Sequence, residues 1–367
     1  MPLACRATKH YESASELNKL LSMNSTSLKE EPKNKLSTTV NSKTLEVTAR
    51  VVAASVIFLT ACFLLNNYLN FWHAWPGMLI FLNSGLNLPD SNSLGWLQVI
   101  SYLLVIPAAV LYVYRNATDT LIENAHKWDS LVRFIIRAAF WAVFLIGLFD
   151  SLISFLRIEG FLPYVVGDNL STQLGRSNFR GLYLHFPLIG LSVLIAAMVK
   201  KIDFFWLALM VVLTEFGIVI SRFVFSYEQA FMGDLVRFWY AALFLFASAY
   251  TFFHDGHVRV DVLYGRFSKH TKAWTNILGI LFLGLPLCWI ILSTGMWEKT
   301  SSIISPLVNY EITQSNYGLY VKYLMVFYLI IFAVTMIIQF CSYFLTNIAD
   351  LLGQSDEDPS VAFLQDH

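Results

Sequence analysis

The sequence predicts an all-α integral membrane protein with about eight transmembrane helices and both termini in the cytoplasm. Three observations support this fold class: the composition, the recurrence of long apolar runs, and the placement of lysine and arginine between those runs. The 367 residues are 56% hydrophobic and 14% charged, which leaves too few charged side chains to cover several water-soluble domains. Apolar runs of about 20 residues predict helices, because a helix satisfies its own backbone hydrogen bonds in the hydrocarbon core.

The predicted elements begin after a polar segment without apolar periodicity, residues 1–46, for which we expect a disordered cytoplasmic tail. Asp150 interrupts the third predicted span, and His185 and Pro187 lie near the start of the fourth. A second cytoplasmic tail is expected over residues 351–367. The eight predicted spans cover residues 47–69, 95–114, 136–156, 181–199, 203–225, 232–253, 273–295 and 320–345.

The orientation follows from the excess of lysine and arginine in cytoplasmic segments of membrane proteins. With the N-terminus inside, the inner segments collect most of these residues, including Lys200 and Lys201 in a tight connection. The acidic residues near the C-terminus weigh little in this rule. Two outer segments, 157–180 and 296–319, are long enough to be interfacial loops or a docking surface for a periplasmic partner.

Several classes of protein find no support in the sequence. Lysine plus arginine equals aspartate plus glutamate at 25 each, so no basic excess indicates a nucleic-acid partner. The four cysteines are widely scattered, without the close spacing of zinc or redox motifs. The sequence contains no recognisable nucleophile elbow or phosphate-binding loop. We therefore expect no catalytic residues, no metal and no cofactor.

Charged residues occur at defined depths in the fifth and sixth predicted spans. Glu215 lies a little past the middle of its span, where a charge costs about 2.5–3.5 kcal/mol on insertion scales. Arg222 and Asp234 end and begin adjacent spans, so we predict an interhelical ion pair between them, and Arg237 shares a helix face with Asp234. Two hypotheses stay open. These charges hold the end of the hairpin at the outer membrane–water interface, or they form a polar contact surface for another membrane subunit.

Polarity recurs in the third and fourth spans and in the inner loop after the sixth span. Asp150 and Arg157 are seven residues apart near an outer end, where two interpretations stay open: buried polarity, or two solvated side chains. His185 has no evident partner.

In the inner loop, Gly256 allows a left-handed turn. His257, Arg259 and Asp261 then alternate with three valines. Such alternation can present one polar and one apolar edge to a neighbouring subunit.

The hairpin and its inner loop resemble the small membrane subunit, or DctQ-type permease, of tripartite ATP-independent periplasmic (TRAP) transporters. The matching features are residues 221–225, which close one span, the acidic Asp234, which opens the next, and above all residues 256–264. The resemblance covers about residues 203–350 and implies a four-helix small-permease core there. Residues 47–199 then form an N-terminal membrane extension of about four spans, which the usual plan of the family lacks. The family also often has glutamate at or beside the position of Asp234.

The resemblance implies a non-catalytic subunit in the bacterial inner membrane that packs on and stabilises a large permease subunit. The large permease would hold the substrate and sodium sites, and a periplasmic binding protein would deliver an organic acid for sodium-coupled uptake. Membrane lipid is the other expected partner. The candidate interface residues are Glu215, Arg222, Asp234, Arg237, Gly256, His257, Arg259 and Asp261. A stand-alone secondary transporter and a membrane anchor of a redox or sensory complex remain as alternatives.

Overall fold

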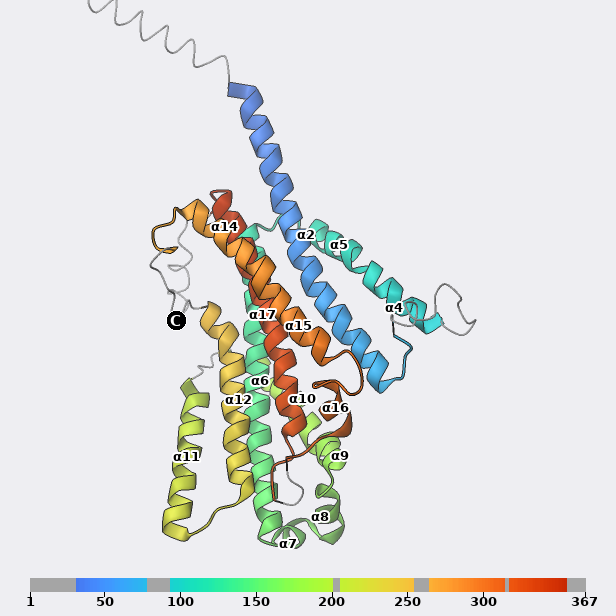
Figure 1. The fold of residues 1–367 in the computed structure, drawn as a ribbon, viewed down its shortest axis with the longest axis vertical. Helices are drawn as coiled ribbons and strands as arrows, with labels where there is room; N and C mark the ends of the chain where they lie inside the picture. Colours follow the sequence, from blue (N-terminus) through green and yellow to red (C-terminus); the bar gives the residue numbers. More distant parts are fainter. Residues whose placement is uncertain (1–30, 78–92, 201–204, 254–263, 314–316, 355–367) are drawn as a thin grey trace, which may run out of the picture. The chain divides into compact units, whose positions relative to one another are not determined.

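The computed structural model describes residues 31–77, 93–200, 205–253, 264–313 and 317–354, and the regular elements within these ranges are all helical (Figure 1). The chain divides into two compact units, Met1–Ala49 and Arg50–His367. The helices of the described residues are α2 (Glu31–Trp72), α4 (Ser93–Leu103), α5 (Val105–Arg115), α6 (Leu121–Ile158), α7 (Leu162–Val166), α8 (Asp168–Leu174), α9 (Ser177–Arg180), η1 (Gly181–His185), α10 (Phe186–Met198), α11 (Phe205–Phe225), α12 (Ala230–Phe253), α14 (Lys269–Gly279), η2 (Ile280–Gly284), α15 (Leu285–Gly295), α16 (Ile304–Asn309) and α17 (Lys322–Leu351).

The predicted all-helical membrane fold is confirmed. Among the described residues, seven helices are long and apolar enough to cross a membrane, and α4 with α5, which bend by 42°, supply an eighth when they are counted as one span. Residues 31–46, expected in a disordered tail, belong to α2. The helix of the first span extends in this direction because each further residue adds a hydrogen bond to a turn that already exists. Residues 1–30 and 355–367 of the two predicted tails lie outside the described residues.

Helix α6 begins 15 residues before the predicted third span. Thr120 caps it with a reciprocal capping box. The Thr120 hydroxyl accepts from the Glu123 N–H at 3.2 Å, and the Glu123 carboxylate accepts from the Thr120 N–H at 2.8 Å. The added turns also pack: Gln339 of α17 donates to Asp129 at 3.1 Å. Because the partner of Asp129 lies 210 residues away in the sequence, hydropathy alone could not predict this extension.

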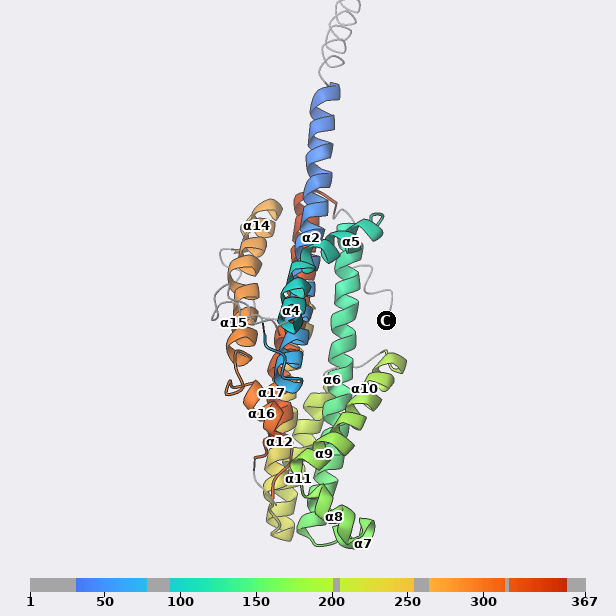
Figure 2. The same ribbon diagram turned by 90° about the vertical axis from the view of Figure 1, so that its right-hand side faces the viewer.

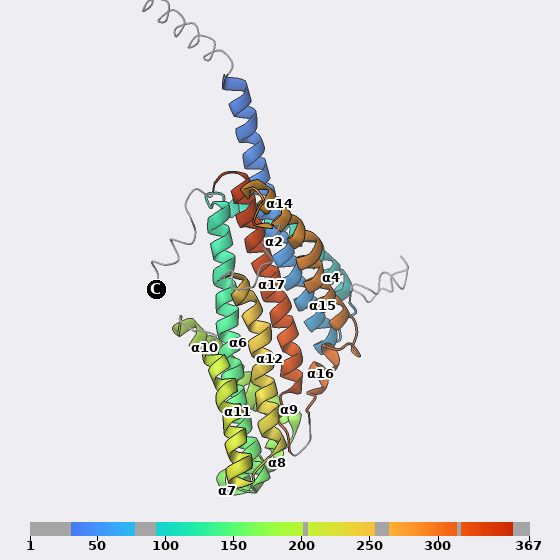
Figure 3. The same cartoon turned by 60° about the vertical axis from the view of Figure 1, so that its left-hand side comes forward.

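Four helices form the core of the second unit. Helix α6 packs against α17, α10 and α12, and α12 packs against α17, an arrangement that can be followed in Figures 2 and 3. Trp239 of α12 donates its indole N–H to the Val143 carbonyl of α6 at 3.1 Å. A side chain at Gly147 would overlap the same indole ring, so the glycine permits this close approach. The predicted extension and the predicted four-helix core therefore share one bundle.

The remaining spans lie at the edge of this bundle. Helix α11 packs on α12, whereas α14 and α15 pack on α17 (Figure 1). The two outer segments predicted as loops contain short helices, α7 to α9 in one and α16 in the other. Two π-helical turns, η1 and η2, each lie just before a proline, Pro187 or Pro286. Proline has no N–H to continue the α-helical ladder, which favours a wider turn before it.

Candidate functional site

A fully buried ion pair joins α6 to α9. Asp150 and Arg180 are both 0% exposed, and Nη1 of Arg180 lies 2.9 Å from Oδ1 of Asp150. The same Nη1 donates to the Ser154 hydroxyl at 3.1 Å, and Nε of Arg180 donates to the Leu174 carbonyl at 3.0 Å. The guanidinium also lies 4.1 Å from the centre of the Tyr320 ring. A buried charge pair needs such additional contacts, because they offset the cost of taking both ions out of water.

His185 continues this cluster toward α17. Its Nε2 lies 3.2 Å from Oδ1 of Asp150, and its Nδ1 lies 2.6 Å from the Tyr323 hydroxyl. With a neutral imidazole, the Tyr323 hydroxyl donates to Nδ1 and Nε2–H donates to Asp150, which satisfies both ring nitrogens. The π-helical turn η1 ends at this histidine. Gly181, at its start, admits the Tyr310 ring, which would lie 2.6 Å from an added Cβ.

Two buried carboxylates hold the segment that leads into α17. The backbone N–H of Leu319 donates to Oδ2 of Asp234 at 3.1 Å, and the next N–H, of Tyr320, donates to Oδ2 of Asp150 at 2.9 Å. The Tyr320 hydroxyl donates to the Gly175 carbonyl at 3.1 Å and accepts from Arg157. Carboxylates at the entry to a helix are favourable, because its first N–H groups carry partial positive charge. We call Asp150, Arg180, His185, Tyr320 and Tyr323 the buried polar cluster.

The buried polar cluster has the parts of a proton relay but no access for a solute. A tyrosine, a histidine and an aspartate follow one another at hydrogen-bond distance, yet Tyr320 and Tyr323 are only 1% and 2% exposed and the three charged or imidazole groups are fully buried. In the described part of the chain, no three histidine, cysteine, aspartate or glutamate side chains are placed to hold a metal ion. The arrangement therefore joins helices rather than presenting reactive groups.

The predicted ion pair between Arg222 and Asp234 is wrong. Nε of Arg222 lies 3.3 Å from the carboxylate of Glu228, in the connection between the two helices, and both side chains are exposed. Asp234 is 6% exposed and faces the segment before α17, while Arg237 lies 3.7 Å from it, as their spacing predicted. The connection supplies a nearer acid for Arg222, and the tertiary fold turns Asp234 toward the backbone of Leu319.

Glu215, placed past the middle of its span by the sequence, is exposed on α11. Leu207 is the residue of α11 that the chain buries, because this helix packs on α12 alone among the larger helix contacts. The predicted inner-loop residues Gly256, His257, Arg259 and Asp261 lie outside the described residues.

The sequence indicated buried polarity at Asp150, but it did not show what would pair with it. Arg157, seven residues later, contacts Tyr320 instead, and the partner of Asp150 is Arg180. His185, for which the sequence indicated no interaction partner, contacts both Asp150 and Tyr323. The available signal was the cost of an aspartate inside a span, which requires a partner without identifying it.

In comparison with known proteins, a family model matches part of the chain. Residues 208–350 match the family model described as tripartite ATP-independent periplasmic transporters, DctQ component. Neither the curated proteins nor the solved structures contain a match. The matched segment starts in α11 and ends in α17, so it includes Asp234, Tyr320 and Tyr323 but not Asp150, Arg180 or His185. The buried polar cluster thus connects the matched segment to the helices that precede it.

Proposed function

We propose, from the match of residues 208–350 to the DctQ component of tripartite ATP-independent periplasmic transporters, that the chain packs on and stabilises a large permease subunit as a non-catalytic small subunit. The transporter would take up an organic acid with sodium across the bacterial inner membrane, after a periplasmic binding protein has delivered it. The family match supports the role as a transporter subunit. Substrate and ion sites would then lie in the large permease.

The observation that carries the packing proposal is the position of Glu215. It is exposed near the middle of α11, and no hydrogen bond or ion pair joins it to any other described residue. Val212 and Val219 lie on the same face, three and four residues away, and are 63% and 48% exposed. A carboxylate facing lipid at this depth costs about 2.5–3.5 kcal/mol. A neighbouring subunit that covers this face and supplies a cation or hydrogen-bond donor removes that cost.

The buried polar cluster has a supporting role in this proposal. Asp150 and Asp234 fix the same two-residue segment before α17 from helices on either side of the family boundary. The helices before residue 200 thereby become part of the scaffold that the large permease contacts. We propose residues 47–199 as an extension that widens this scaffold, with both chain termini in the cytoplasm. Reporter fusions at residues 1 and 367 would test the orientation, since a periplasmic signal from either end contradicts it.

Co-purification tests the packing proposal. When the chain is co-expressed with its large permease, Glu215→Gln should lower recovery of the complex, because truncating one partner of a desolvated charge pair costs about 2–5 kcal/mol. Glu228→Gln is the matched control, since Glu228 is exposed in the connection and pairs within the chain. Equal recovery of both variants and the wild type would contradict packing through α11.

Reconstitution separates this function from that of a stand-alone secondary transporter. The purified chain alone in liposomes should accumulate no organic acid under a sodium gradient. Addition of the large permease and the binding protein should produce uptake. Accumulation by the chain alone would show that it transports by itself, and the subunit proposal would then be wrong.

A further inference from the structure

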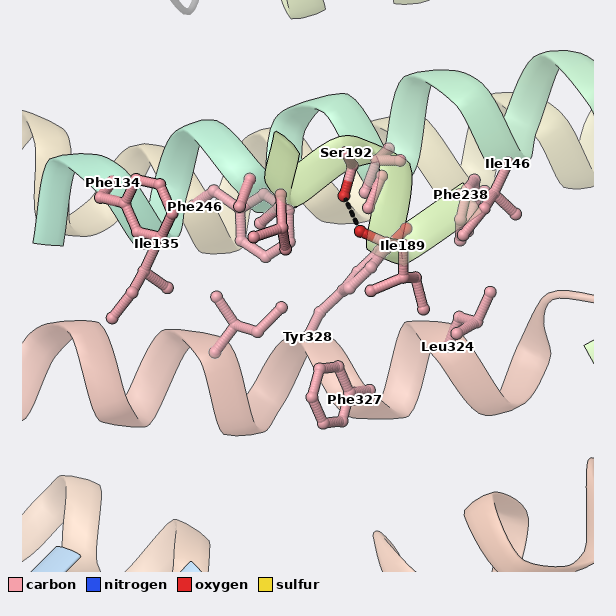
Figure 4. A pocket seen from close by; sticks show the side chains of 16 residues that line it. Phe134, Ile135, Ile146, Ile189, Ser192, Phe238, Phe246, Leu324, Phe327 and Tyr328 are labelled. Atoms are coloured by element: carbon pink, nitrogen blue, oxygen red, sulfur yellow. Dashed lines mark hydrogen bonds between the residues drawn. The ribbon is translucent and has the colours of Figure 1, made fainter. Parts of the chain in front are cut away.

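A cavity of about 300 Å³ lies inside the bundle of α6, α10, α12 and α17. Its lining is apolar, and Figure 4 shows side chains such as Phe134, Ile146, Phe238 and Phe246 around it. Val193 and Phe327 also line it and are 41% and 40% exposed, so the cavity opens to the surroundings of the bundle at these residues. The helices that form it are membrane spans, and its mouth therefore faces lipid.

Tyr328 brings an unpaired polar group into this apolar space. The side chain is 3% exposed, and its hydroxyl has no hydrogen-bond partner within the described chain. Its ring lies between Phe238 and Phe246, at 5.4 and 5.0 Å between ring centres, and in Figure 4 it extends from α17 across the cavity toward α10. Burying a hydroxyl without a partner is unfavourable. The hydroxyl of Ser192 in the same lining is satisfied, since it donates to the Ile189 carbonyl at 2.6 Å.

The depth and charge of the cavity restrict what can satisfy Tyr328. Tyr328 lies six residues inside Lys322, the first residue of α17, or about 9 Å along the helix at 1.5 Å per residue. Half of a bilayer hydrocarbon core is about 15 Å thick, so the backbone of Tyr328 lies within the hydrocarbon region and not at the level of lipid headgroups. No residue in the lining carries a charge. The acceptor must therefore belong to a neutral molecule that dissolves in the hydrocarbon core.

We propose that this cavity binds a membrane-soluble quinone whose carbonyl oxygen accepts a hydrogen bond from the Tyr328 hydroxyl. The flat ring lies against the aromatic side chains of Phe238 and Phe246, and an isoprenoid tail leaves past Val193 and Phe327 into the bilayer. A simple acyl chain would fill the apolar space but would leave the hydroxyl unpaired. The binding is independent of the assembly proposed above, because the cavity and the α11 face lie on different helices.

The test uses the purified full-length chain in detergent and a decyl-substituted benzoquinone as the probe, with binding measured by calorimetry. We expect saturable binding. Tyr328→Phe keeps the ring and should weaken binding about threefold to tenfold, as one hydrogen bond implies. Ser192→Ala is the matched control, because it removes a hydroxyl of the same lining that already has a partner, and it should leave the affinity unchanged. Ala142→Phe should abolish binding by filling the cavity.

The proposal would be overturned by the absence of saturable binding, by equal affinity of the wild type and Tyr328→Phe, or by equal competition from decylbenzene, which has the ring and chain but no carbonyl. A phospholipid that stays bound in native mass spectrometry and resists displacement by the quinone would also overturn it. Thermal melting shows whether each variant is folded. If Ala142→Phe does not fold, Ala138→Leu fills the same cavity with a smaller side chain and replaces it.

Discussion

Replacement of Asp150 by asparagine should strongly destabilise the bundle, although the two side chains have nearly the same shape. The carboxylate accepts from Arg180, His185 and the backbone N–H of Tyr320 at 2.9, 3.2 and 2.9 Å. The amide of Asp150→Asn leaves the guanidinium of Arg180 fully buried without a counter-ion, and its NH₂ group must face one of these donors. Removal of one partner from a buried ion pair costs about 3–5 kcal/mol, and we expect a loss of this size.

The matched control is Glu311→Gln, another change from carboxylate to amide. Glu311 pairs with Lys322 at 2.8 Å, but the two side chains are 40% and 48% exposed. An exposed pair contributes about 0–1 kcal/mol, so this variant should remain close to the wild type. The free energy of unfolding is measured for each purified chain in mixed micelles with increasing dodecyl sulfate.

A double variant distinguishes loss of charge pairing from loss of packing. Asp150→Asn combined with Arg180→Met removes both charges and keeps an amide that can pair with the Tyr320 N–H and His185, and removal of both charges of a buried pair is often neutral or stabilising. It should therefore recover most of the stability that Asp150→Asn loses. The reasoning is refuted if Asp150→Asn costs less than about 1 kcal/mol, the range of an exposed pair. It is also refuted if the double variant is no more stable than the single one.

Two further predictions concern Gly181 and Tyr227. Gly181→Ala should lower the free energy of unfolding by about 1–3 kcal/mol, as overpacking does, because the added methyl group meets the Tyr310 ring; Gly190→Ala, with open space at its Cβ, is the control. Burial, and then the 2.6 Å hydrogen bond to Glu159, raise the pKa of Tyr227 to about 12. Its stabilising contribution is therefore complete below pH 10 and is lost as the pH rises through 12. The difference in tyrosinate absorbance between the wild type and Tyr227→Phe should titrate near pH 12, and a midpoint near 10 would contradict this contact.

The candidate site was only partly predictable from the sequence. Asp150 was recognisable as a costly residue inside a span, because its cost depends on its own apolar neighbours. Its partners were not, since Arg180 follows 30 residues later and Tyr320 follows 170 residues later. The predicted pair of Arg222 with Asp234 rested on similar depth in adjacent helices, but depth does not determine the direction in which a side chain points. Glu228, six residues from Arg222, supplied the nearer acid.

Local properties of the chain were sufficient to predict the helical membrane fold, the approximate number of spans and the family model that residues 208–350 match. Hydropathy and helix formation depend on about 20 consecutive residues, and a short motif can identify a family. The tertiary structure decided that α6 lies in the same bundle as α12 and α17, that Glu215 faces outward, and that Tyr328 lines a cavity. These features depend on which helix faces meet. Residues far apart in sequence determine that packing. Hydropathy does not distinguish between alternative packings of the same helices.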